Sequence, residues 1–186
     1  AAGEAAMLAA VPGAVILRPS IVFGPEDDFF NRFAAMARLM PFLPVVGPDT
    51  RFQPVFVGDV AAAAALAVNG GARPGTVYEL GGPEVKTFRE CLELVNAETD
   101  RSRPIVAIPF PIARLQARLM ALMPKPPLTV DQVRLLERDN VVSEAARAEG
   151  RTLEGLGLTP TSLAAILPAY LWTYRPPGQF EPRRAG

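Results

Sequence analysis

The string ILRPSIVFGP, residues 16–25, contains small and polar residues where an apolar run reaches a Pro and Gly turn. The β-branched run before this turn predicts a strand over residues 14–24, buried on both faces as in a parallel sheet. Open α/β sheets bind ligands at the carboxyl ends of their strands. We therefore expect backbone groups of Pro19, Ser20 and Ile21 to be available to a ligand.

Arg18 lies inside the same apolar run. A buried guanidinium without a partner is costly, so Arg18 needs a carboxylate. Glu4, on the helical segment that precedes the strand, is the natural candidate. A purely structural ion pair between Glu4 and Arg18 is the simpler interpretation, and it is compatible with a ligand site beside the pair.

The composition excludes several kinds of chemistry. The 186 residues include no His and a single Cys, Cys91, so we expect no His-based metal site, no Ser-His-Asp triad and no internal disulfide. Nineteen basic residues balance nineteen acidic ones, which gives no signal for nucleic acid or an anionic membrane. No apolar stretch reaches the ~20 residues of a membrane span. We expect a soluble or at most peripheral protein with no metal.

Patterns typical of strands and helices alternate along the first half of the chain. Further strands are predicted over residues 51–57, 76–82 and 104–109, and helices over residues 1–10, 29–40, 60–68 and 88–98. The acidic residues 26–28 favour the start of the second helix. Asp59 is the predicted N-cap of the third helix, and Thr87 with Glu90 forms a capping box for the fourth. The alternation predicts an α/β protein with a mainly parallel sheet.

The C-terminal part of the chain is mostly helical in pattern. Residues 110–124 predict a basic amphipathic helix with Arg114 and Arg118 four residues apart and Lys125 just beyond it. Two interpretations remain open: a docking surface for a membrane or a partner subunit, or a helix packed on its own domain. The aromatic and basic end, residues 170–186, is more typical of partial core and a solvated tail than of a nucleic-acid platform.

Two strings, ILRPSIVFGP and QPVFVGDVAAAAALAV, resemble the extended short-chain dehydrogenases/reductases, the NAD-dependent epimerase and dehydratase family. Residues 18–25 match the R-P-x-x-V-Y/F-G-P motif of that family, and residues 57–60 match its V-x-D-V motif. The resemblance implies that Pro19, Ser20 and Ile21 contact the nicotinamide side of a dinucleotide.

It further implies that Glu4, Arg18 and Asp59 are structural residues near the cofactor site. Asp59 would cap a helix close to the substrate pocket and have no catalytic role.

The strings FGPEDDFFNRFA and RFQPVFVGDVA are similar to an atypical branch of this family, which contains the NAD(P)-binding accessory subunit of respiratory complex I. This resemblance implies a nucleotide-binding, non-catalytic accessory subunit of an NADH:quinone oxidoreductase. NADP(H), with NAD(H) as the alternative, would be held structurally, and other complex I subunits would be the partners. The protein would lie peripherally on the cytoplasmic face of a bacterial inner membrane, or on the matrix side in a mitochondrion.

Two motifs of the family are missing from this sequence: the G-x-x-G-x-x-G turn that binds pyrophosphate and the catalytic Y-x-x-x-K pair. The pairs Gly70-Gly71 and Gly81-Gly82 are interpreted as ordinary loop glycines. In family members the Lys falls a few residues before an A-x-G-E string, here residues 1–4. We therefore expect the chain to start inside a helix, just after the catalytic segment, and to be inactive alone.

The alternative function is an active NAD(P)-dependent epimerase, dehydratase or reductase whose Gly-rich turn and Tyr-x-x-x-Lys lie upstream. A stand-alone interaction module is less attractive, because an incomplete sheet would expose an apolar edge.

The resemblance implies the C-terminal portion of a Rossmann-like parallel sheet plus a smaller, mostly helical region. Residues 1–80 would be the C-terminal part of the NAD(P)-binding domain with interspersed substrate-domain elements. Residues 81–175 would form the smaller substrate or docking region, and residues 176–186 a tail.

Overall fold

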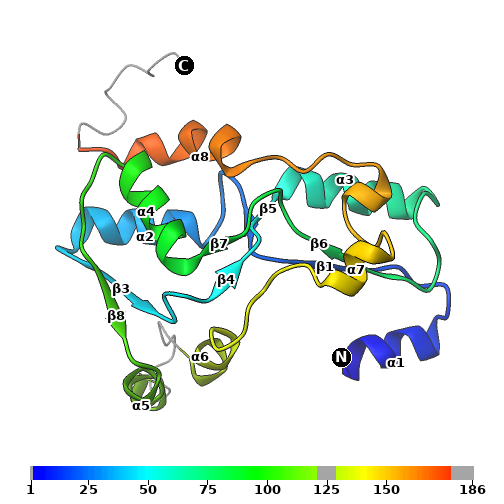
Figure 1. Ribbon diagram of the computed structural model, residues 1–186, viewed down its shortest axis with the longest axis horizontal. Coiled ribbons are helices and arrows are strands. Elements are labelled where there is room, and N and C mark those ends of the chain that lie inside the picture. The colour runs from blue at the N-terminus through cyan, green and yellow to red at the C-terminus, as the bar shows by residue number, and fades with distance from the viewer. Residues whose placement is uncertain (1, 121–128, 177–186) are drawn as a thin grey trace. The chain divides into compact units, whose positions relative to one another are not determined.

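The computed structural model describes residues 2–120 and 129–176 (Figure 1). The strands are β1 (Ile16–Pro19), β2 (Val22–Phe23), β3 (Leu43–Val46), β4 (Arg51–Phe52), β5 (Val55–Phe56), β6 (Val77–Leu80), β7 (Lys86–Thr87) and β8 (Ile105–Ile108). The α-helices are α1 (Ala2–Ala10), α2 (Phe30–Leu39), α3 (Val57–Val68), α4 (Phe88–Glu98), α5 (Phe110–Met120), α6 (Val130–Leu135), α7 (Glu144–Ala148) and α8 (Leu163–Leu171). Two short 3-10 helices cover Glu154–Leu156 and Trp172–Tyr174. The chain is an α/β protein, as predicted.

The chain divides into two compact units, each built from three separate segments. Unit 1 comprises the described residues of Ala1–Gly24, Gln53–Val85 and Val141–Ile166. Unit 2 comprises those of Pro25–Phe52, Lys86–Asn140 and Leu167–Gly186. The units therefore interleave along the chain, whereas the division expected from the sequence used contiguous ranges. The roles assigned to residues 1–80 and 81–175 stay predictions.

Unit 1 contains two parallel strand pairs. Strand β1 pairs with β6, which places Arg18 opposite Glu79, and β2 pairs with β5. The single strand expected over residues 14–24 is therefore two strands with different partners. Its expected burial on both faces is also wrong, because Ile16 and Leu17 are only half-buried and the last two residues of β1 are exposed. Exposure of Arg18 and Pro19 shows that the described residues do not fully cover the faces of β1.

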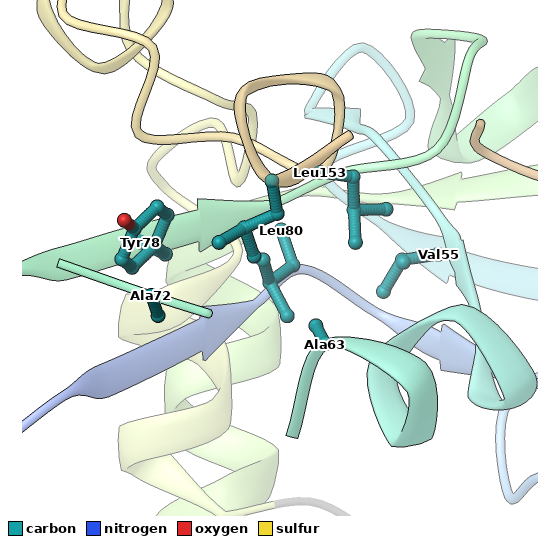
Figure 2. Packing of buried hydrophobic residues seen from close by; sticks show 7 residues of the cluster. Val55, Ala63, Ala72, Tyr78, Leu80 and Leu153 are labelled. Atoms are coloured by element: carbon teal, nitrogen blue, oxygen red, sulfur yellow. The ribbon is translucent and has the colours of Figure 1, made fainter. Parts of the chain in front are cut away.

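The core of unit 1 lies between β6 and the Ala-rich helix α3. Figure 2 shows the side chains of Val55, Leu80 and Leu153 gathered beside Ala63, the buried residue of α3. Small side chains on α3 let its backbone approach the strands closely. Burial of apolar surface in this cluster is the main favourable contribution to the folding free energy of the unit. Tyr78 closes the cluster, and its hydroxyl accepts a hydrogen bond from the Arg73 N–H at 3.0 Å.

Asp59 does not cap α3, contrary to the prediction. The helix continues directly from β5, so its N-cap position falls on Phe56 and Asp59 lies within the first turn. The Asp59 carboxylate instead accepts hydrogen bonds from the N–H and the hydroxyl of Thr161, at 2.7 and 2.9 Å. It thus fixes a distant segment of unit 1 onto the start of α3, where the helix dipole also favours a negative charge.

Unit 2 combines the parallel pair β3–β8 and the antiparallel pair β4–β7 with helices α2 and α4, which pack on one another (Figure 1). Phe29, Phe33, Phe52 and Phe88 form an aromatic cluster, with ring centroids 5.4 Å apart for Phe33 and Phe88. Tilted and edge-on contacts of this kind are the favourable arrangements for aromatic rings.

Local signals predicted two helix starts of unit 2 correctly. The Asp27 carboxylate accepts hydrogen bonds from the N–H groups of Phe30 and Asn31, at 2.5 and 3.2 Å, and so begins α2. At α4 the capping box is complete: the Thr87 hydroxyl accepts from the Glu90 N–H at 3.2 Å, and the Glu90 carboxylate accepts from the Thr87 N–H at 2.6 Å.

No helix within residues 2–120 and 129–176 is both long and apolar enough to cross a membrane.

Cys91 is fully buried on α4, and burial raises the pKa of its thiol to about 12. Because only the thiolate is nucleophilic, we expect Cys91 to resist iodoacetamide at neutral pH in the native protein and to react once the protein is unfolded in guanidinium. Mass spectrometry of the alkylated protein measures this directly. Stoichiometric labelling of Cys91 under native conditions would show that α4 does not pack as described.

Candidate functional site

The three residues predicted to contact a cofactor lie together where β1 ends. Pro19 is the last residue of β1 and is exposed, Ser20 is buried, and Ile21 is half-buried. The Ser20 N–H donates to the Leu80 carbonyl at 2.9 Å, and the Ile21 carbonyl accepts from the Val55 N–H at 2.9 Å. These two backbone groups were expected to be available to a ligand, and that expectation is wrong, because both continue the strand pairing. The strand pairing holds the backbone of this segment in place, and a ligand there would contact the exposed surface of Pro19.

A buried amide, the side chain of Gln53, holds the surroundings of Ser20 in place. The Gln53 N–H donates to the Ser20 hydroxyl at 3.2 Å. Its side-chain Nε2 donates to the Gly82 carbonyl at 2.7 Å, and its Oε1 accepts from the Val142 N–H at 3.0 Å and from Arg147 at 3.2 Å. The backbone and side chain of Gln53 therefore connect the end of β1, the turn after β6 and the segment of residues 142–147. Sequence reasoning missed Gln53, although a polar residue in the short apolar run RFQPVFV is the kind of signal that could have identified it.

A recess of about 340 Å³ opens beside this amide. It is lined by Gln53, Gly82, Pro83, Val142, Arg147, Thr152 and Glu154. Arg147, Thr152 and Glu154 supply a positive charge, a hydroxyl and a carboxylate, which suit hydrogen bonding to a small polar group. The lining includes no Tyr, Lys or Cys, so it provides hydrogen bonds but no Tyr–Lys pair of the kind that a reductase of this family uses.

The pair Gly81-Gly82 is not an ordinary loop, contrary to the prediction. Both residues are buried, and a Cβ at Gly82 would lie 2.0 Å from the Pro54 carbonyl oxygen. A Cβ at Gly81 would lie 2.5 Å from the Gln53 side chain. The two glycines therefore allow the turn after β6 to approach the Gln53 segment closely.

Arg18 forms the predicted ion pair with Glu4 and a second one that the sequence did not reveal. Its guanidinium donates to both carboxylate oxygens of Glu4, and Glu79 on β6 lies 3.5 Å away. The hydrogen bond from Arg18 lowers the pKa of Glu4 to about 2. Arg18 was expected to be buried, but its side chain is 44% exposed, so the pair is worth little to stability.

Glu79 also accepts a hydrogen bond from the Ser143 N–H, at 2.8 Å, which links β6 to the start of α7. The cluster around Arg18 thus has a structural role beside the carboxyl end of β1.

Helix α5 packs one face on its own unit, and its role as a docking surface stays a prediction. Ala113 and Ala117 are buried within unit 2 against Val46 and Val133, so one face packs on its own unit. The other face exposes an apolar stripe of Ile112, Leu115 and Leu119, between 50% and 63% exposed.

Of the predicted docking residues, Arg114 pairs with Glu137, with Nε 3.0 Å from the carboxylate. Arg118 has no ion pair within the described part of the chain. Lys125 lies outside the described residues.

Comparison with known proteins shows that the chain is similar to curated mitochondrial NADH dehydrogenase subunits. It matches no family model. It is 36% identical over 189 residues to "NADH dehydrogenase (ubiquinone) 1 alpha subcomplex subunit 9, mitochondrial" of Arabidopsis thaliana, a match that covers 96% of this chain and 46% of the relative. The protein of the same name from Rattus norvegicus is 32% identical over 170 residues, covering 88% of this chain and 43% of the relative. The chain thus spans about half the length of the curated relatives it matches.

Solved structures similar to this chain belong to the extended dehydrogenase/reductase fold. UDP-glucose 4-epimerase of Thermus thermophilus, in complex with NAD, has a TM-score of 0.59 at 20% identity and is matched over 94% of this chain and 51% of its own. RMD of Pseudomonas aeruginosa, complexed with NADPH, has a TM-score of 0.60 at 19% identity, over 93% and 53%. At this identity the likeness shows the fold alone. The predicted Rossmann-like fold is confirmed.

Gly82→Ala should lower the free energy of unfolding by at least about 2 kcal/mol, because its Cβ would collide with the Pro54 carbonyl. Gly13→Ala is the matched control, since a Cβ there meets nothing within 4 Å. Urea unfolding of the two variants measures the difference. Equal stability of the two variants would mean that the turn after β6 does not lie against Pro54.

Proposed function

The chain belongs to the family of NADH dehydrogenase alpha subcomplex subunit 9, and we propose on that premise that it is part of a nucleotide-binding, non-catalytic accessory subunit of a respiratory NADH:quinone oxidoreductase. The observation that carries the proposal is the 36% identity over 96% of the chain. Other subunits of that complex are the proposed partners. The proposed location is peripheral, on the cytoplasmic face of a bacterial inner membrane or on the matrix side in a mitochondrion.

The residues at the end of β1 fit one end of a dinucleotide. Exposed Pro19 and half-buried Ile21 present apolar surface suited to a flat nicotinamide ring, and Ser20 between them is fixed by Leu80 and Gln53. A bound dinucleotide would supply redox chemistry at that ring. Two structural neighbours are described as complexes with NAD and with NADPH. We propose NADP(H) as the ligand, with NAD(H) as the alternative, and Pro19, Ser20 and Ile21 as one wall of its site.

None of the tyrosines of this chain matches the catalytic Tyr of the family. Tyr78 is buried and accepts a hydrogen bond from the Arg73 N–H, and the buried Tyr170 donates its hydroxyl proton to Asp27. None of the three tyrosines precedes a Lys by four residues, which is the spacing of the family's catalytic pair. Any Tyr–Lys pair for the alternative function, an active epimerase, dehydratase or reductase, must therefore come from outside this chain.

Denaturing the full-length protein should release about one NADP(H) per subunit, measured by chromatography of the supernatant, while the native protein shows no turnover with nucleotide sugars. Purified protein that holds no nucleotide would contradict the proposal. Steady turnover would instead establish the alternative function.

Pro19→Glu tests the proposed wall, because it adds a carboxylate beside the nicotinamide and its neighbouring phosphates. We expect nucleotide occupancy to fall about tenfold, a difference of about 1.4 kcal/mol. Val11→Glu, at an exposed position of unit 1, is the control and should keep full occupancy. If Pro19→Glu also retains its nucleotide, the end of β1 does not contact it.

We further propose that α5 is a docking surface of the subunit. Its apolar stripe, Ile112, Leu115 and Leu119, has no cover within the described residues of unit 2, and Arg118 adds an unpaired positive charge among these residues. An exposed apolar patch with a basic rim is typical of contact with a partner or a membrane.

Leu115→Glu combined with Leu119→Glu should reduce incorporation of the subunit into the assembled complex, because two carboxylates would replace the apolar contact. Leu39→Glu, at a position of α2 that is 78% exposed, is the control. Native gel electrophoresis of assembled complexes measures incorporation. Equal incorporation of the two variants would exclude α5 from the interface.

A further inference from the structure

Three arginines of unit 2, Arg89, Arg101 and Arg103, line a shallow cavity of about 480 Å³. The other lining residues are Glu93, Asn96, Ser102, Pro104 and Ile105. The lining therefore carries three guanidinium groups and one carboxylate, a formal excess of two positive charges. No role assigned above involves this cavity.

The guanidinium groups of Arg101 and Arg103 are held by backbone carbonyls instead of carboxylates. Arg101 donates from Nε and Nη2 to the Tyr174 carbonyl, at 3.3 and 3.2 Å. Arg103 donates from Nε to the Ala37 carbonyl near the end of α2, at 2.8 Å. Within the described part of the chain, their remaining N–H groups meet no acceptor and neither arginine has an ion pair. Donors are therefore left over for a ligand.

Arg175, another partly buried arginine of the same unit, is instead neutralised by carboxylates. Arg175 lies 3.5 Å from Asp100 and 4.0 Å from Glu98. Asp100 directly precedes Arg101 in the chain, yet it pairs with Arg175. The carboxylate nearest in sequence is thus engaged away from Arg101 and Arg103.

The loop that carries Arg101 and Arg103 is fixed in advance. The Asn96 side chain donates to the Arg103 carbonyl at 2.9 Å and accepts from the Arg103 N–H at 3.2 Å. The Arg101 N–H donates to the Asn96 carbonyl at 2.9 Å, and Asp100 takes a left-handed φ of 49° to make the turn. A site whose side chains are held by such contacts loses little entropy when a ligand binds.

Placing these cations together has an electrostatic cost. The pKa of Arg101 is lowered by burial and by the positive charges of Arg103 and Arg38. An anion bound between them would remove this repulsion.

We propose that Arg89, Arg101 and Arg103 form a binding site for the phosphate group of an anionic ligand. A phosphate monoester carries about −1.5 to −2 charges at neutral pH, which matches the excess of two positive charges at the cavity. Its oxygens also match the fork of a guanidinium, which donates two parallel hydrogen bonds. The phosphate could be that of a soluble monoester or of phosphatidic acid, a phospholipid whose headgroup is itself a phosphate monoester.

The test uses the full-length protein loaded with NADP(H), so that the proposed dinucleotide site is already filled. The probes are inorganic phosphate, followed by isothermal titration calorimetry, and phosphatidylcholine vesicles with and without phosphatidic acid, followed by sedimentation. In Arg101→Gln/Arg103→Gln we expect binding at least about tenfold weaker, because charge-assisted hydrogen bonds are lost. Arg134→Gln/Arg138→Gln removes the same charge from exposed positions of unit 2 and should bind normally.

Arg89→Gln provides a second test of the site in case the double variant does not fold. The Arg89 side chain makes no hydrogen bond or ion pair within the described residues, so its loss should weaken binding without lowering the melting temperature. Binding of inorganic phosphate assigns a soluble monoester, and sedimentation only with the vesicles that contain phosphatidic acid assigns a headgroup. The proposal is overturned if neither probe binds, or if the arginine variants bind as well as the control. Calorimetry and sedimentation do not depend on nucleotide release. A negative result would therefore contradict the phosphate site without contradicting the proposed function.

Discussion

The side chain of Gln53 is the contact on which the surroundings of the proposed cofactor wall depend. It is a buried amide, and a buried amide that lost its partners would be costly to the folded state. Its oxygen and nitrogen reach Gly82, Val142 and Arg147, while its backbone N–H reaches the Ser20 hydroxyl. Networks of this kind specify one arrangement, because any other leaves polar groups unpaired in a low-dielectric interior. The end of β1 is therefore fixed by a contact from outside the strand.

This constraint agrees with the proposed role, in which the protein holds a ligand without turning it over. Retention needs a rigid wall and few moving parts, and the end of β1 is rigid because Ser20 is held on two sides, by Leu80 and by Gln53. The ion pairs of Arg18 with Glu4 and Glu79 connect β1 to α1 and to β6, although their exposure to solvent limits their contribution to stability. Unit 2 contributes different features: an apolar stripe on α5 and a cationic cavity at residues 101–103. Each is suited to contact with something outside the chain.

Local interactions were predictable from the sequence. The capping box of Thr87 and Glu90 and the acidic start of α2 at Asp27 depend on residues three or four positions apart, so their patterns are visible along the chain. The alternation of strands and helices likewise predicted the α/β fold, although the single strand expected over residues 14–24 is the two strands β1 and β2. Strand β3 was missed because Pro44 lies within it, and proline is unfavourable in most strands.

Contacts between distant segments could not be predicted in the same way. Gln53 meets Val142, and Asp59 meets Thr161, across about half of the chain, so no spacing rule reveals either pair. Asp59 matched an N-cap pattern, but the helix begins earlier because it continues directly from β5. Gly81 and Gly82 matched a loop pattern, and only the positions of Gln53 and Pro54 show why they must be glycine. Arg101 stands beside Asp100 in the sequence, yet Asp100 pairs with Arg175.

A crystal structure of the full-length protein with NADP(H) is the most direct test of the central claim, that the end of β1 forms the nicotinamide-side wall of a nucleotide site. The account predicts that the nicotinamide ring lies against Pro19 and Ile21, with Ser20 still bonded to Leu80 and Gln53. A nucleotide bound elsewhere, with no atom of the ring in contact with residues 19–21, would contradict it.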